Sequence, residues 1–70
     1  MATKRKGRFE IRLDYYDRNW KETTKTLFNG AIKEQMLNLL RGVKGIQGDR
    51  AIRIYVYDTE EGTKHSEHEY

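Results

Sequence analysis

The chain has 70 residues, a formal net charge of +3, and 36% charged residues without cysteine or proline. This length predicts a single domain. The lack of cysteine excludes disulfides and thiolate metal sites and fits a reducing compartment. No apolar run approaches the roughly 20 residues of a membrane span. We therefore expect a cytoplasmic protein that has no contact with membranes.

The charge is distributed unevenly along the chain. The first eight residues carry four cations and no acid, whereas the last thirteen carry five acids and one lysine. We expect residues 1–7 to form a flexible basic arm, residues 8–58 a single domain, and residues 59–70 a flexible acidic tail. A basic arm is suited to contacting phosphates, but a solvated terminus that keeps the protein soluble explains it equally well.

Residues 9–16, FEIRLDYY, alternate between inward apolar and outward polar side chains. This period of two predicts a half-buried β-strand. The following Asp17–Asn19 has the residue types of a hairpin loop. We interpret Asp14 and Asp17 as solvent-exposed or capping carboxylates beside this turn.

Residues 20–28, WKETTKTLF, predict a second strand, because threonine and aromatic residues favour extended structure. The register of this strand is ambiguous, since Trp20 and Phe28 share one face whereas Leu27 shares the other with the lysines. A bulge would place both Trp20 and Leu27 in the core. We favour the register that turns Trp20 and Phe28 inward and the lysines outward.

Residues 30–43 have clear helical periodicity, with their apolar side chains on one stripe. Asn29 is a suitable N-cap, and Gly42 or Gly45 is suited to end the helix. A helix this short is marginal alone in water, so strands must cover its stripe. The stripe consists of Ile32, Met36, Leu39, Leu40 and Val43.

Residues 50–58, RAIRIYVYD, alternate again and predict a third strand. The helix returns the chain, so this strand can pair with the first one. The sequence thus predicts an α+β fold in the order β-β-α-β. Its three-stranded antiparallel sheet, in the order 2-1-3, has one helix packed on one face. The outer strands leave free edges for a homodimer, and the sequence leaves the oligomeric state open.

We expect the open face of the sheet to interleave cations with aromatic rings. Lys and Arg neutralise phosphates, and rings stack on bases. The same residue types also form hot spots in protein interfaces, and strand propensity alone explains any single tyrosine. The candidate binding residues on the arm and this face are Lys4, Arg5, Lys6, Arg8, Arg12, Tyr16, Lys21, Lys25, Arg53, Tyr55 and Tyr57.

Catalysis has no support in the sequence. Both histidines, His65 and His68, lie in the polar tail, and no serine or threonine has a plausible base partner. Two histidines are far short of a metal site. The GVKG at 42–45 has the shape of a phosphate-clamping loop, but helix-stop and turn glycines explain it better. We expect a non-enzymatic protein with no cofactor and no metal.

Residues 7–17, GRFEIRLDYYD, followed by Lys21, Lys25 and Phe28, resemble the arm-type DNA-binding domains of phage integrases, which are similar to AP2-like modules. The resemblance covers about the first half of the chain. It implies a sheet laid into the DNA major groove, with Arg12, Lys21 and Lys25 in contact. That family places three strands before its helix, whereas here the third strand follows it. The 2-1-3 topology is also similar to small phage-encoded inhibitors of host enzymes.

Two functional hypotheses follow from these patterns. The first is a small non-enzymatic nucleic-acid-binding protein, with DNA favoured, that uses the open sheet face and the N-terminal arm. The second is a protein-binding inhibitor or regulator of a host enzyme, encoded by a phage or mobile element. In the second hypothesis the acidic tail would repel DNA but could dock on a basic partner.

Overall fold

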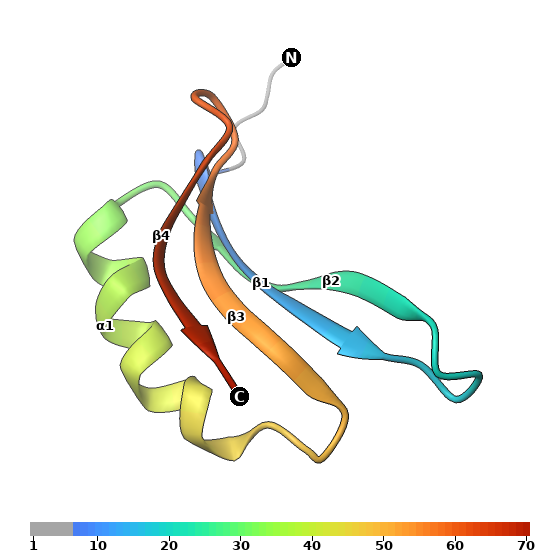
Figure 1. Cartoon of the computed structure of the whole chain (residues 1–70). Coiled ribbons are helices and arrows are strands. Elements are labelled where there is room, and N and C mark those ends of the chain that lie inside the picture. The colour runs from blue at the N-terminus through green and yellow to red at the C-terminus, as the bar shows by residue number, and fades with distance from the viewer. Residues whose placement is uncertain (1–6) are drawn as a thin grey trace.

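The computed structural model describes residues 7–70, which form one antiparallel sheet with a helix on one face (Figure 1). The elements are β1 (Phe9–Tyr16), β2 (Glu22–Gly30), α1 (Lys33–Val43), a 3-10 turn η1 (Lys44–Ile46), β3 (Ala51–Asp58) and β4 (Thr63–Glu69). The predicted α+β class, with one helix and an antiparallel sheet, is confirmed. The predicted number of strands is wrong, because β4 extends the sheet to the order β2-β1-β3-β4.

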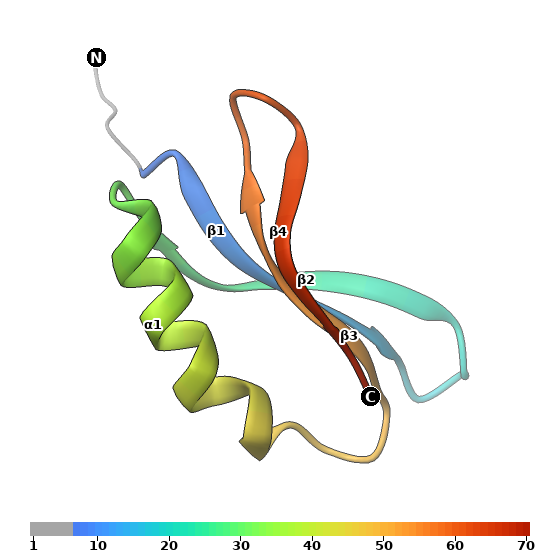
Figure 2. The same cartoon turned by 60° about the vertical axis from the view of Figure 1, so that its left-hand side comes forward.

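The core lies between α1 and the two central strands. Figure 2 shows α1 lying along one face of the sheet. Alternate residues of β1 and β3 point to this face, because successive side chains of a strand point to opposite sides. Met36 and Leu40 of α1 pack against them, as the helical periodicity predicts. The buried core consists of Phe9, Ile11, Leu13, Met36, Leu40, Ile54 and Val56.

The helix begins later than predicted. α1 starts at Lys33, and the preceding Ile32 is extended, about half exposed, and makes no side-chain capping bond. Asn29 is not the N-cap, because it belongs to β2 and its side chain bonds both the N–H and the carbonyl of Gly7. This contact fixes Gly7 against the end of β2. A Cβ on Gly7 would lie 2.1 Å from the carbonyl carbon of Gly30, so only glycine fits there.

The C-terminal end of the helix also differs from the prediction. Gly42 lies inside α1 and Gly45 inside η1, so neither glycine ends the helix in a left-handed conformation. A turn of 3-10 helix ends the segment instead, as is common at helix termini. In residues 7–70, no helix is long and apolar enough to cross a membrane.

β2 contains the bulge that the sequence left open. The favoured register is wrong for Trp20 and Lys25, whereas Phe28 pairs with Ile11 and so lies on the helix side, as that register has it. The register shifts opposite Ile11, so that Leu27 and Phe28 both face one residue of β1. Leu27 packs against the core, whereas Phe28 is 41% exposed. Trp20 precedes β2 and is 65% exposed. Lys25 pairs with Leu13, which places Lys25 on the helix side of the sheet rather than on the open face.

The segment expected to be a flexible acidic tail forms β4. It pairs with β3 from Asp58 and Thr63 onward and contains a bulge at Ser66, whose φ is 55°. The bulge puts His65 and His68 on the same side of the sheet as the helix, because they pair with the core residues Val56 and Ile54, and both histidines are partly buried. β4 therefore shields the edge of β3 although it contributes no aliphatic side chain to the core.

Candidate nucleic-acid interface

Asp14 is the centre of a polar network on the open face. Its carboxylate accepts hydrogen bonds from Thr24 Oγ1 at 2.6 Å, Arg53 Nη1 at 2.6 Å and Tyr55 Oη at 3.1 Å. These partners converge because Asp14 pairs with Thr24 of β2 on one side and with Arg53 of β3 on the other. Asp14 is buried, so its interpretation as a solvent-exposed or capping carboxylate is wrong.

The network fixes the protonation states of its members. Burial alone would raise the pKa of Asp14, but the hydrogen bonds from Thr24, Arg53 and Tyr55 outweigh it and lower the pKa. Burial, followed by the negative charge of Asp14, raises the pKa of Tyr55. The hydrogen bond to Asp14 is the main cause that raises the pKa of Arg53. At neutral pH, Asp14 and Arg53 are therefore charged and Tyr55 is neutral.

The other cations of this face also have partners. Arg12 Nε lies 2.7 Å from Glu10 Oε1, and its guanidinium carbon is 4.0 Å from the ring centroid of Tyr57. The ammonium of Lys64 is 4.7 Å from the ring centroid of Tyr55. The carboxylate of Glu10 thus occupies the Nε donor of Arg12, which a phosphate would otherwise accept from.

Acids outnumber bases on the open face. Arg53 contacts Glu22 at 3.1 Å and Glu67 at 3.5 Å in addition to Asp14. The strand register, and for Glu67 its contact with Arg53, place three cations and five acids on this side: Arg12, Arg53 and Lys64, with Glu10, Asp14, Glu22, Glu67 and Glu69. The face is therefore a self-paired, net acidic surface, which disfavours the approach of a phosphate backbone.

The sequence-predicted binding residues fall into separate groups. Arg12, Arg53, Tyr55 and Tyr57 come together on the open face. Lys25 lies on the opposite face, where its ammonium is 4.9 Å from the ring centroid of Tyr15. The three remaining lysines and arginines of the arm, Lys4, Arg5 and Lys6, lie outside the described residues.

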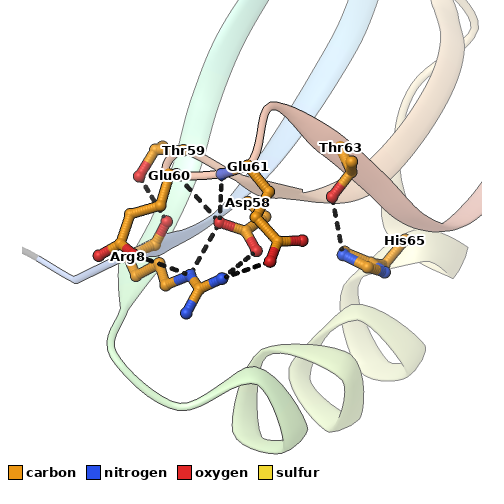
Figure 3. A network of polar contacts seen from close by, with 7 residues as sticks. All are labelled: Arg8, Asp58, Thr59, Glu60, Glu61, Thr63 and His65. Atoms are coloured by element: carbon orange, nitrogen blue, oxygen red, sulfur yellow. Dashed lines mark hydrogen bonds and ion pairs between the residues drawn. The ribbon is translucent and has the colours of Figure 1, made fainter.

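Arg8 is engaged in a structural network (Figure 3). Its Nε and Nη2 donate to the two carboxylate oxygens of Asp58, each at 2.8 Å. Asp58 also accepts the backbone N–H groups of Glu60 and Glu61, which closes the turn between β3 and β4. The bond from Arg8 is the main cause that lowers the pKa of Asp58 to about 2. Arg8 therefore joins the first described residues to the β3–β4 turn.

A second group of aromatic and basic side chains lies at the β1–β2 hairpin. The ring centroid of Trp20 is 6.0 Å from that of Tyr16 and 4.9 Å from the guanidinium carbon of Arg50. The backbone N–H of Tyr16 donates to the carbonyl of Arg50, which brings the loop before β3 to the hairpin. We call this group the hairpin cluster; its exposed residues are Tyr16, Arg18, Trp20, Lys21 and Arg50.

The sequence predicts only part of this cluster. Tyr16 and Lys21 are among its candidates, but Trp20 is expected inward and the two arginines are not selected. The reason is the turn, in which Asp17 Oδ1 accepts the backbone N–H groups of Asn19 and Lys21. This Asx-type bonding extends the loop to Lys21 and carries Trp20 out of the strand. The polar run around Asp17 was the available signal.

No family model, curated protein or solved structure matches this chain. The three residues that the integrase resemblance implies as DNA contacts do not share a surface. Arg12 lies on the open face, Lys21 in the hairpin turn and Lys25 on the helix side. Among residues 7–70, no group of three His, Asp or Glu side chains is arranged to hold a metal ion.

Proposed function

We propose that the chain is a small non-enzymatic nucleic-acid-binding protein whose contact surface is the hairpin cluster rather than the open sheet face. The observation that carries the proposal is the exposed ring of Trp20, which lies beside Tyr16 and Arg50. Aromatic faces stack on bases, and neighbouring cations neutralise phosphates. Here both kinds of group occur together on exposed side chains.

The charge distribution supports the same surface. Residues 7–70 carry equal numbers of cations and acids, because three of the fourteen Lys and Arg precede Gly7. The acids concentrate on the open face and in the turn after β3, where Glu60 and Glu61 lie beside Asp58. The hairpin and the loop that contacts it carry Arg18, Lys21 and Arg50 against Asp17 and Asp49, so they keep a small net positive charge. A polyanion therefore meets its most favourable surface at the hairpin.

The test is a salt titration of binding to nucleic acid. Three phosphate contacts predict a slope of log affinity on log salt of about −2.7 for duplex DNA or about −2.1 for single strands. Arg18→Ala and Lys21→Ala are each expected to flatten the slope by about 0.7–0.9. Lys64→Ala is the matched control, because Lys64 lies on the acidic open face and is expected to leave the slope unchanged.

Binding weaker than about 10⁻⁴ M at physiological salt, below ordinary non-specific affinity, would contradict the proposal. Equal effects of Lys64→Ala and Lys21→Ala would also contradict it, because the contact would then not be at the hairpin.

A protein target is the second candidate. Trp, Tyr and Arg are the residue types that dominate binding energy in protein interfaces, and the net acidic open face is suited to a basic partner. If the chain inhibits or regulates a host protein, the chain should capture that protein from host lysate in the presence of nuclease. Such capture by the wild type, and its loss in Trp20→Ala, would favour this function over nucleic-acid binding.

A further inference from the structure

We infer that Trp20 is a stacking platform for an unpaired base, and that the ligand of the hairpin cluster is single-stranded DNA or RNA. This inference rests on the proposed function and names its ligand class. Single-stranded DNA and single-stranded RNA share the chemistry that the cluster recognises, namely a base with a free π-face next to a phosphate. They are separated by the experiment below.

The backbone at Trp20 gives the first argument. Its φ is 61°, in the left-handed region that bulky side chains rarely adopt and glycine adopts without cost. The turn holds this conformation through the bond from Trp20 N–H to the carbonyl of Asp17 at 2.9 Å, and through the bonds of its neighbours to Asp17 Oδ1. Turn geometry alone would favour a small residue at this position.

The surroundings of the ring give the second argument. Trp20 is 65% exposed, so burial does not explain the presence of an indole. Tyr16 and Arg50 contact the ring and restrict its orientation, and the rest of its surface faces solvent. A large ring that is oriented but not buried is suited to stacking with a base from a partner.

The choice of a single strand follows from where the ring lies. The exposed indole lies in the turn of a hairpin, with the guanidinium of Arg50 4.9 Å from its ring and the exposed Arg18 and Lys21 in the same turn. These cations are available to contact the phosphates that flank one base. In a duplex both faces of each internal base are already stacked, so stacking on Trp20 would require unstacking a base step. An unpaired base carries no such cost.

Trp20 is the sole tryptophan of the chain, so its fluorescence reports on the proposed contact directly. The experiment titrates the full chain with oligothymidylate and oligouridylate of about twelve nucleotides, and with a duplex of the same length. We expect saturable quenching by the single strands, with weaker binding of the duplex. The single strand that binds with the higher affinity shows whether the ligand is DNA or RNA.

Affinities of variants are measured by anisotropy of a labelled oligonucleotide. Trp20→Ala is expected to bind the single strand roughly 5- to 150-fold more weakly, the effect of losing one stacked base. The matched control is Phe28→Ala, which removes an exposed aromatic residue at the other end of β2 and is expected to change affinity less than about twofold. Circular dichroism confirms that both variants fold.

The outcomes separate this inference from the proposed function. Binding of single strands without quenching, or an unchanged affinity in Trp20→Ala, would overturn the inference while leaving nucleic-acid binding in place. Duplex binding as tight as single-strand binding would overturn the choice of ligand. No binding of any oligonucleotide would overturn both the inference and the proposed function.

Discussion

Replacing Asp14 with asparagine is expected to destabilise the fold strongly. The amide oxygen can still accept from Thr24 and Tyr55, but the amide nitrogen then faces Arg53 Nη1, which the carboxylate contacts at 2.6 Å. The Asp14 side chain is only 6% exposed, so water cannot replace the lost bond. A hydrogen bond to a charged group contributes about 1.5–3 kcal/mol. A domain of this size has a total stability of about 3.5–10 kcal/mol.

Urea denaturation of the purified variants measures this effect. With a slope of about 1 kcal/mol per molar, Asp14→Asn should lower the midpoint by about 1.5–3 M. The matched control is Glu22→Gln, which makes the same chemical change against the same Arg53 at 3.1 Å but on a side chain that is 53% exposed. It should cost at most about 0.5 kcal/mol. Equal losses in the two variants would refute the role of burial in this network.

Three further perturbations follow from the fold. Ile54→Ala should cost about 2–5 kcal/mol, because Ile54 is fully buried, whereas the half-exposed Ile32→Ala should cost less than about 1 kcal/mol in the same urea assay. Removing residues 63–70 should cost at least about 2 kcal/mol, since each lost backbone hydrogen bond contributes about 0.5–1.5 kcal/mol; unchanged stability would show that β4 is not part of the cooperative unit. The pKa of Asp58 is about 2 when folded, below the reference value of 3.8. The stability from its pairing with Arg8 is therefore present above pH 3.8 and lost as the pH falls toward 2, and acid unfolding of Asp58→Asn should lack this component.

The sequence predicts the helices and strands whose apolar side chains recur with a clear period. The alternation in β1 and β3 and the stripe of α1 place Ile11, Ile54, Met36 and Leu40 in the core, because apolar burial is the strongest local signal of structure. β4 has no aliphatic residue, so its pairing with β3 leaves no period of hydrophobicity to recognise. Its strand character comes from backbone hydrogen bonds to β3, the strand that precedes it across a short turn.

The candidate site was only partly predictable for a related reason. The alternation of β3 predicts that Arg53 and Tyr55 behave differently from its apolar residues, but not that Asp14 gathers them. That depends on register across three strands, which bulges shift. The prediction misplaces Trp20 because the hairpin loop is two residues longer than expected, which moves Trp20 and Lys21 from the strand into the turn. The length of the loop is decided by the hydrogen bonds of Asp17, which the residue types allow but do not fix.

The register shifts have a consequence for assembly. Two of them lie on the outer strands, with the bulge at Leu27 and Phe28 in β2 and the one at Ser66 in β4. An outer strand has unpaired N–H and carbonyl groups with which a strand of another copy can pair. A bulge bends the outer strand and interrupts this row of backbone groups. Pairing through β2 is confined to the stretch from Glu22 to Thr26. Both sides of the sheet are thus protected against fibre-like growth, and the protein is expected to remain dispersed at high concentration.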